Sequence, residues 1–170
     1  MRHPDDLPRW LFLFGLAYAF MHVAPVFLTV EIENRLTGGD ILAILSPLVV
    51  VSAAWKLFSI LSPALNIIHE TAVFWLMLAA SLLYAGGQGM NLAANAIARH
   101  LTDQGTTPLF QLTSFFDEML GHILWHTGMI GMTTALLLRA RSLQGSRSKA
   151  LCFLGSLLFA FAYFTDAVEG

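Results

Sequence analysis

The chain has 170 residues, of which 56% are hydrophobic and 12% are charged, and its formal net charge is -2. A soluble domain carries about 25% charged residues, so this composition argues against a water-soluble protein and indicates an integral membrane protein. The near-neutral charge gives no basic patch for nucleic acid, and the single cysteine, Cys152, excludes a disulfide framework and a cysteine-based metal cluster within the chain.

Five apolar segments are each suited to cross a bilayer, because about 20 helical residues span a hydrocarbon core of about 30 Å. Pro25 lies in the first segment and Pro47 in the second, and a polar loop with a Gly-Gly break separates the two. We therefore predict an all-α fold, a polytopic integral membrane bundle of about five transmembrane helices that forms one domain over residues 1–170. The predicted spans are residues 10–30, 41–61, 72–98, 109–138 and 150–168.

The loops between these spans differ in their content of lysine and arginine, which predicts the orientation of the chain. The side that contains the N-terminus has most of the basic residues, and the opposite side has Arg35 and Arg99. Cytoplasmic loops of membrane proteins are rich in lysine and arginine. We therefore expect the N-terminus in the cytoplasm and, after five spans, a non-cytoplasmic C-terminus.

The fourth span has polar residues along one face. At 100° per residue, Glu118, His122 and His126 follow one another at intervals of four, and Trp125 lies on the same stripe. Two histidines four residues apart on a helix can bind one metal ion, because their rings point the same way one turn apart. The acid one turn earlier can serve as a third ligand, as a hydrogen-bond partner that orients a ligating histidine, or as a general base.

The third span has a second polar stripe, formed by Tyr84, Gln88, Asn91 and Asn95. Carboxamides in lipid need hydrogen-bond partners, and we expect the stripe on the fourth span to supply them. The small residues Ala85, Gly89 and Ala93 run beside this stripe. Their spacing is typical of a face that another helix approaches closely.

Four spans place polar side chains at similar depths in the predicted topology. Glu118 and the three carboxamides lie in the non-cytoplasmic half, Asp166 lies near the outer surface and His22 lies near mid-membrane. Ionisable groups inside a membrane cost roughly 2.5–3.5 kcal/mol each, which favours a functional site over simple helix packing. Interhelical hydrogen bonding remains the structural alternative for the histidine pair and for the asparagines.

The segment GHILWHTGMIG, residues 121–131, resembles the last-helix signature of the CREST superfamily of membrane hydrolases, which includes the alkaline ceramidases. That signature has two histidines four residues apart, often with tryptophan before the second, followed by small residues. The family is a seven-helix bundle that holds zinc by three histidines and cleaves amide bonds in lipids. The resemblance implies that His122 and His126 are zinc ligands, and His22 is the candidate for the third.

The favoured function is accordingly a zinc-dependent intramembrane hydrolase that acts on a lipid or another amphipathic substrate. The metal would lower the pKa of bound water and polarise the scissile carbonyl. Glu118 is the candidate general base, and Asp166 is the second candidate. Asn91 and Asn95 would orient the substrate or stabilise an oxyanion. The remaining candidates for substrate contacts are Gln88 and Trp125.

Two other functions fit the same residues. A b-type haem protein would use His22 together with His122 or His126 as axial ligands. A non-catalytic transporter, proton pathway or membrane-complex subunit would use the buried histidine, glutamate and asparagine network to carry protons or to hold helices together. Membrane lipids are the expected surroundings, and a second copy of the chain or another membrane subunit is the expected partner of the small-residue face.

Overall fold

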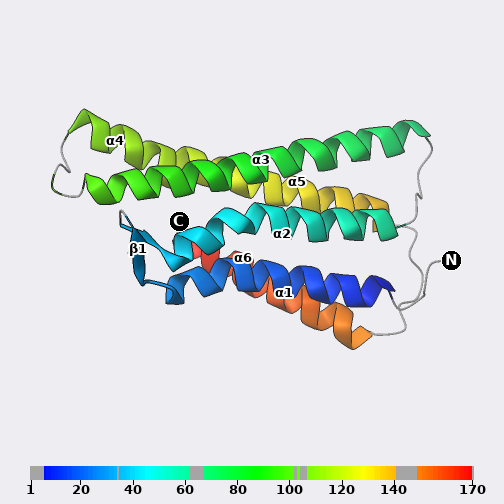
Figure 1. The fold of residues 1–170 in the computed structure, drawn as a ribbon. Helices are drawn as coiled ribbons and strands as arrows, with labels where there is room; N and C mark the ends of the chain where they lie inside the picture. The colour runs from blue at the N-terminus through cyan, green and yellow to red at the C-terminus, as the bar shows by residue number, and fades with distance from the viewer. Residues whose placement is uncertain are drawn as a thin grey trace.

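The computed structural model describes residues 6–33, 35–61, 67–101, 103, 107–140 and 149–169. The predicted all-α class is confirmed, since helices make up nearly all of this part of the chain (Figure 1). The helices are α1 (Asp6–Phe27), α2 (Gly38–Ile60), α3 (Ile67–His100), α4 (Pro108–Ser114), η2 (Phe115–Gly121), α5 (His122–Ala140) and α6 (Lys149–Glu169). The short strands β1 (Glu31–Glu33) and β2 (Leu36–Thr37) form an antiparallel hairpin between α1 and α2.

Three of the helices, α1, α2 and α3, are long and apolar enough to cross a membrane. Their outer faces are apolar, since Phe20, Leu48 and Leu82 are each more than half exposed. Leu137 on α5 and Phe161 on α6 are exposed to a similar degree. Many large apolar side chains exposed on several helices are unusual for a monomeric soluble protein and suit contact with lipid tails.

The segment between the first two predicted spans differs from the polar loop that the sequence predicts. It forms the β-hairpin, in which Arg35 has a φ of 62°, and α2 begins at Gly38 rather than at residue 41. The side chain of Thr37 accepts a hydrogen bond from the backbone of Asp40, and the Asp40 carboxylate accepts one from the backbone of Thr37. This capping box starts the helix at the glycine pair. Gly39 is needed for contact with α1, because a Cβ there would lie 3.1 Å from the carbonyl carbon of Pro25.

The fourth predicted span is a continuous helical rod with a π-helical segment, η2, in its first half. A π segment changes the number of residues in a turn, so the helices on its two sides do not share one 100° register. Gln111 on α4 is exposed, whereas Trp125 on α5 is 6% exposed. Trp125 is thus buried, whereas Glu118, which the spacing puts on the same stripe, is exposed. Glu118, His122 and His126, which lie at and after η2, keep a common face.

Glycine residues allow α3 and α5 to touch backbone to backbone. A Cβ on Gly87 would lie 2.6 Å from the carbonyl oxygen of Gly121 and 2.8 Å from the Cα of Trp125. A Cβ on Gly128 would lie 2.6 Å from the Cα of Tyr84. Real Cβ atoms do not approach so closely, so this interface depends on glycine at both positions.

The small-residue face of Ala85, Gly89 and Ala93 does not make this approach. A Cβ built on Gly89 would have no atom within 4 Å, so none of the described helices packs there. All three residues line a cavity between α2 and α3 instead. The expectation of close packing at this face is thus not met within the chain, because α5 contacts α3 one face away, at Gly87.

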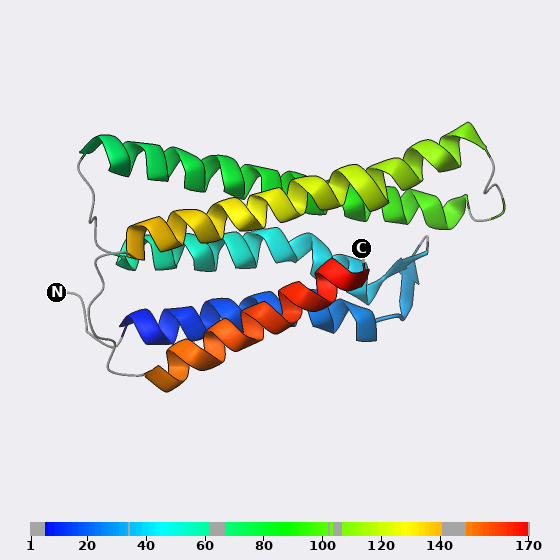
Figure 2. The ribbon, with the colours of Figure 1, turned by 180° about the vertical axis from the view of Figure 1, so that it is seen from behind.

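The helices form two groups (Figures 1 and 2). In one group α1 packs against α2 and α6, and in the other α3 packs against η2 and α5. Contact between α2 and α3 is much less extensive than contact within either group. The seam between α2 and α3 is therefore packed more weakly than the interfaces within either helix group.

Charged groups join the two helix groups at both ends of this seam. At one end Arg99 of α3 donates two hydrogen bonds to the Asp40 carboxylate of α2, at 2.5 and 2.7 Å. At the other end the guanidinium of Arg139 on α5 lies 4.0 Å from the centre of the Phe58 ring on α2. Arg139 also pairs with Glu70 of α3 at 3.4 Å. Both ends of the seam are thus held by a cation.

Candidate functional site

The centre of the candidate site is a stack of three aromatic rings. The indole of Trp125 on α5 lies between the imidazoles of His22 and His126, with ring centroids 5.3 and 4.9 Å away. The planes are nearly parallel, at 5° and 20°. Tyr18, which is fully buried, covers the other face of His22 at 4.0 Å, and Tyr163 of α6 meets His126 edge to face at 5.4 Å. The tryptophan therefore separates two histidines from opposite helix groups.

His22 forms one end of a hydrogen-bonded chain across three helices. Its Nε2 is 3.2 Å from the hydroxyl of Tyr84 on α3, and that hydroxyl is 3.2 Å from the Oγ of Ser46 on α2. The other ring nitrogen, Nδ1, is 2.8 Å from the carbonyl oxygen of Tyr18. A carbonyl only accepts, so Nδ1 carries a hydrogen, and Nε2 of the neutral ring accepts from Tyr84. Tyr84 then accepts from Ser46.

His122 is held by a second set of hydrogen bonds. The Nδ2 of Asn91 on α3 lies 3.1 Å from His122 Nε2 and 3.5 Å from the carbonyl oxygen of Asp117. His122 Nδ1 lies 3.1 Å from the carbonyl oxygen of Glu118. By the same reasoning Nδ1 is the protonated nitrogen, and Nε2 accepts from the amide of Asn91. The expected contact between the third-span and fourth-span stripes is therefore present at Asn91.

Glu118, His122 and His126 line one open groove of about 430 Å³ along η2 and α5. Glu118 is exposed, and the two histidine rings are 6.0 Å apart between centroids. The Nδ1 of His126 is buried and has no hydrogen-bond partner among the described residues. The groove thus presents three titratable groups on one helix face, as the spacing predicts.

The other sequence-derived candidates lie elsewhere. Gln88 is buried and lines the cavity between α2 and α3, away from the α5 stripe, and Asn95 is exposed. Trp125 occupies the centre of the ring stack. Asp166 belongs to α6, but it is outside the residues whose side chains the structure describes.

The described residues do not fit a zinc site with three protein ligands. His22 faces Tyr84, and the indole of Trp125 lies between His22 and His126. Within the residues that the structure describes, no three histidine, cysteine, aspartate or glutamate side chains gather closely enough to hold a metal ion. The same indole occupies the space that a haem between His22 and His126 would need. The two histidines of the groove are the remaining candidate metal ligands.

Sequence reasoning missed Ser46 and the role of Tyr84. Tyr84 is recognisable as the first member of the third-span stripe, but its partner His22 lies 62 residues away in the chain. Ser46 stands directly before Pro47 in an apolar helix and has no periodic signal. Because each partner comes from a different helix, only the packing of α1, α2 and α3 brings them together.

In comparisons with protein families, with curated proteins and with solved structures, nothing matches the chain. The functional proposals below therefore rest on the geometry of the site and on the chemistry of its residues.

Proposed function

We propose that the chain is a multi-pass membrane protein that conducts protons. The observation that carries this proposal is the chain of hydrogen bonds from Ser46 through Tyr84 to His22. Hydroxyl groups and imidazoles both donate and accept hydrogen bonds, so a proton can pass along them. When a hydronium ion delivers a proton to the Ser46 hydroxyl, Ser46 passes its own hydrogen to Tyr84 and Tyr84 passes its hydrogen to Nε2 of His22. Each O–H bond that breaks is replaced, and only the imidazole gains a charge. Ionisable residues within apolar helices mark proton relays in many pumps and transporters.

In this proposal the chain crosses the membrane five times. The three long apolar helices supply three spans, the rod from Pro108 to Ala140 supplies the fourth and α6 supplies the fifth. At 1.5 Å per residue, the rod and α6 are each about 30 Å long or longer, which matches one hydrocarbon thickness. The bias of lysine and arginine in the loops supports an orientation with the N-terminus in the cytoplasm and the C-terminus on the other side.

His22 is the last group in the series of hydrogen bonds from Ser46 through Tyr84, and it accepts the proton. Its Nδ1 already has a hydrogen, so a proton arriving from Tyr84 at Nε2 makes the ring a cation. That cation is stacked between the faces of Tyr18 and Trp125. Aromatic faces attract cations by about 0.5–2 kcal/mol, which offsets part of the cost of placing the charge there.

The groove with His126 is the second proton site. Because the indole of Trp125 separates His22 from His126, movement of Trp125 or of a helix group is needed before a proton can pass between them. The two groups of helices meet at the weakly packed seam between α2 and α3. Transport proteins alternate access by the motion of one helix group against another around a central site, and this seam is suited to that motion.

The test is proton flux into liposomes that contain the purified chain and an internal pH-sensitive dye. A potassium gradient with valinomycin supplies the driving potential. We expect flux above that of empty liposomes, and we expect Tyr84→Phe to reduce it about tenfold or more, because a phenyl ring cannot relay a proton. The variant loses two hydrogen bonds, which costs about 2 kcal/mol, so its fold is checked by circular dichroism and gel filtration.

Tyr163→Phe is the matched control. It removes a phenolic hydroxyl from the same aromatic cluster, but that hydroxyl does not belong to the series of hydrogen bonds from Ser46 through Tyr84 to His22. Its flux is expected to equal that of the wild type. Wild-type flux equal to that of empty liposomes, or unchanged flux in folded Tyr84→Phe, would refute the proposal.

A second candidate function is the metal-dependent hydrolase that the CREST resemblance implies. The observation that favours it is the open groove shared by Glu118, His122 and His126. In that function the two histidines would bind the metal, Glu118 or Asp166 would act as general base, and an amphipathic substrate would enter from the lipid.

Elemental analysis by mass spectrometry tests this candidate. The detergent-purified wild type is compared with the double variant His122→Ala/His126→Ala. The hydrolase proposal predicts about one zinc per chain in the wild type and loss of that zinc in the double variant. A folded wild-type protein without stoichiometric metal would contradict it, and iron at that level would direct attention to redox chemistry.

A further inference from the structure

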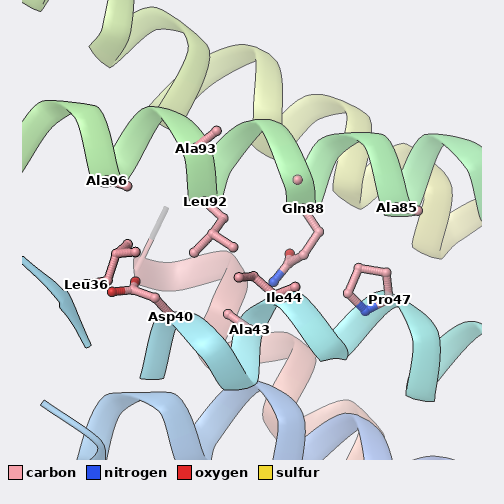
Figure 3. Close-up of a pocket in the computed structure, with 11 residues that line it drawn as sticks. Leu36, Asp40, Ala43, Ile44, Pro47, Ala85, Gln88, Leu92, Ala93 and Ala96 are labelled. Atoms are coloured by element: carbon pink, nitrogen blue, oxygen red, sulfur yellow. The ribbon is translucent and has the colours of Figure 1, made fainter. Parts of the chain in front are cut away.

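A cavity of about 460 Å³ lies between α2 and α3 (Figure 3). Apolar side chains make up most of its lining, which includes the small-residue face of Ala85, Gly89 and Ala93. Ala93 of α3 and Ile44 of α2 line it from opposite sides, and both are exposed on the surface of the bundle. The cavity therefore opens sideways, toward the region that lipid tails occupy in a membrane.

Two buried polar side chains line this cavity, and they differ in what they offer to a ligand. The Asp40 carboxylate already accepts hydrogen bonds from Arg99 and Thr37. Gln88 is 9% exposed, and its carboxamide oxygen is enclosed by the protein without a hydrogen-bond partner among the described residues. The amide nitrogen of Gln88 is the atom that points from α3 toward α2 (Figure 3). Gln88 thus presents its donor to the cavity.

The chemistry of this nitrogen selects the kind of ligand atom that can meet it. A carboxamide nitrogen carries two hydrogens and only donates. None of the hydrogen bonds found among the described residues uses the amide nitrogen of Gln88. Because buried polar atoms in native proteins are nearly always paired, a donor that faces a cavity indicates a ligand that accepts. A carbonyl oxygen is the uncharged acceptor that matches an amide N–H.

The charges around the cavity favour a ligand without a charge of its own. None of the described residues that line it is a lysine or an arginine, whereas Asp40 contributes a carboxylate. That carboxylate is bound bidentately by Arg99 and is therefore compensated within the protein. An anionic head group would find no cation in the lining to replace its lost hydration.

The depth of Gln88 favours a lipid other than the bilayer phospholipids. Its amide lies at the level of Ile44 and Pro47 of α2 (Figure 3), which are about 9–14 Å along the axis from the start of that helix. At 23 residues α2 is about 34 Å long, little more than the hydrocarbon core of a bilayer. The amide therefore lies within the hydrocarbon region, deeper than the ester groups that phospholipids hold at the interface.

From these features we propose that the cavity binds an uncharged lipid that enters from the membrane and accepts a hydrogen bond from the amide nitrogen of Gln88 through a carbonyl oxygen. The volume lies within the range of small-molecule sites, about 300–1,000 Å³, and the apolar walls suit an alkyl chain. This site is separate from the groove on α5 and from the hydrogen bonds at His22, so it does not depend on either proposed function.

The test is competitive photolabelling of the full chain in nanodiscs of ether-linked phosphatidylcholine, which has no ester carbonyl. The photoprobe is a long-chain alkane with a diazirine group, and peptides from residues 40–47 and 85–96 report labelling of the cavity. The competitors are a long-chain ketone and the alkane of the same length. The measured quantity is the potency of the ketone relative to that of the alkane.

Gln88→Leu assigns this relative potency to one side chain, because it keeps the approximate size and removes the donor. We expect the relative potency to be about fivefold higher in the wild type than in the variant, the factor that one hydrogen bond is worth. Differences in how the two competitors distribute in the bilayer cancel in this comparison. Gln111→Leu changes an exposed glutamine on α4 and is expected to match the wild type. Equal relative potencies in the wild type and folded Gln88→Leu would overturn the proposal.

A second variant tests the location of the site. A Cβ on Gly89 would have no atom within 4 Å, so Gly89→Leu extends a side chain into the cavity without a backbone clash. Labelling of the peptide from residues 40–47 is expected to fall about fivefold or more. Gly86→Leu is the matched control, since a Cβ there is equally free but Gly86 does not line the cavity. Undiminished labelling in folded Gly89→Leu would show that the probe binds elsewhere and would refute the site.

The same competition in ester-linked phosphatidylcholine distinguishes the source of the carbonyl. The advantage of the ketone is expected to persist there, because the bilayer esters lie nearer the surface than Gln88. Loss of the advantage in ester-linked lipid alone would mean that bilayer phospholipids occupy the cavity, contrary to the proposal of a separate lipid.

Discussion

Replacing Gly87 with alanine is expected to lower the unfolding temperature of the purified protein strongly, whereas the same change at Gly86 is expected to raise it slightly. The new Cβ at position 87 would lie within 3 Å of backbone atoms of Gly121 and Trp125, and backbone cannot move aside as a flexible side chain can. Overpacking of this kind costs about 1–3 kcal/mol and forces α3 away from α5.

Gly86 is the matched control because it lies in the same turn of the same helix. A Cβ there would meet no atom within 4 Å, so Gly86→Ala gains the helix propensity of alanine, about 1 kcal/mol, without a clash. Circular dichroism during heating in detergent measures both variants against the wild type. If the two alanine variants unfolded at the same temperature, the backbone contact between α3 and α5 would be disproved.

Replacing Arg99 with leucine is expected to be the second strongly destabilising change. The Asp40 side chain is 8% exposed and receives two hydrogen bonds from the guanidinium. Loss of the arginine leaves a buried carboxylate whose one remaining partner among the described residues is Thr37. Breaking a buried pair costs about 3–5 kcal/mol, and because the arginine side chain is 29% exposed we expect about 2 kcal/mol.

A double variant distinguishes the ion pair from a simple loss of packing. Asp40→Asn/Arg99→Leu removes the carboxylate charge as well, so it should be more stable than Arg99→Leu alone. Arg9→Leu, at an exposed position on α1, is the control for removing one arginine. Thermal unfolding in detergent reports all three variants. A double variant that is less stable than Arg99→Leu would show that the carboxylate does not depend on the arginine.

The long elements of the fold could be predicted because composition and hydropathy vary along the chain on the scale of a whole helix. Local hydrogen bonds make the ends of these helices differ from the predicted ends. The Gly-Gly pair predicted a break, yet the capping box of Thr37 and Asp40 uses it to begin α2. The pair is also where α1 approaches, as the position of Gly39 against Pro25 shows. The Gly-Gly pair alone does not show whether it interrupts a helix or begins one that packs closely against a neighbour.

The candidate site was predictable where it lies on one helix. Glu118, His122 and His126 share a groove because their spacing of four places them on one face whatever surrounds them. The sequence predicts His22 near these residues only because all of them lie at a similar depth in the membrane. Depth does not determine the direction in which a side chain points. In the structure His22 faces Tyr84, and Trp125 separates it from His126.

The position of small residues was the hardest feature to predict. Ala85, Gly89 and Ala93 have the spacing of a helix-packing face, whereas Gly87 has no partner at that spacing in its own helix. The structure uses Gly87 for packing and leaves Gly89 on the cavity. What determines this is the rotation of α3 about its axis, and that rotation depends on neighbours that lie far away in sequence.

The pairing of α1 with α6 has a consequence for the order of assembly during synthesis. Gly15 and Gly155 meet backbone to backbone, since a Cβ on Gly155 would lie 2.6 Å from the carbonyl oxygen of Leu11. Ribosomes make chains from the N-terminus, so α1 exists long before the helix that covers this face. Until residue 155 has been made, the face of α1 that contains Gly15 can contact only lipid or another protein. A nascent chain that stalls before residue 155 would therefore expose the face of α1 that contains Gly15.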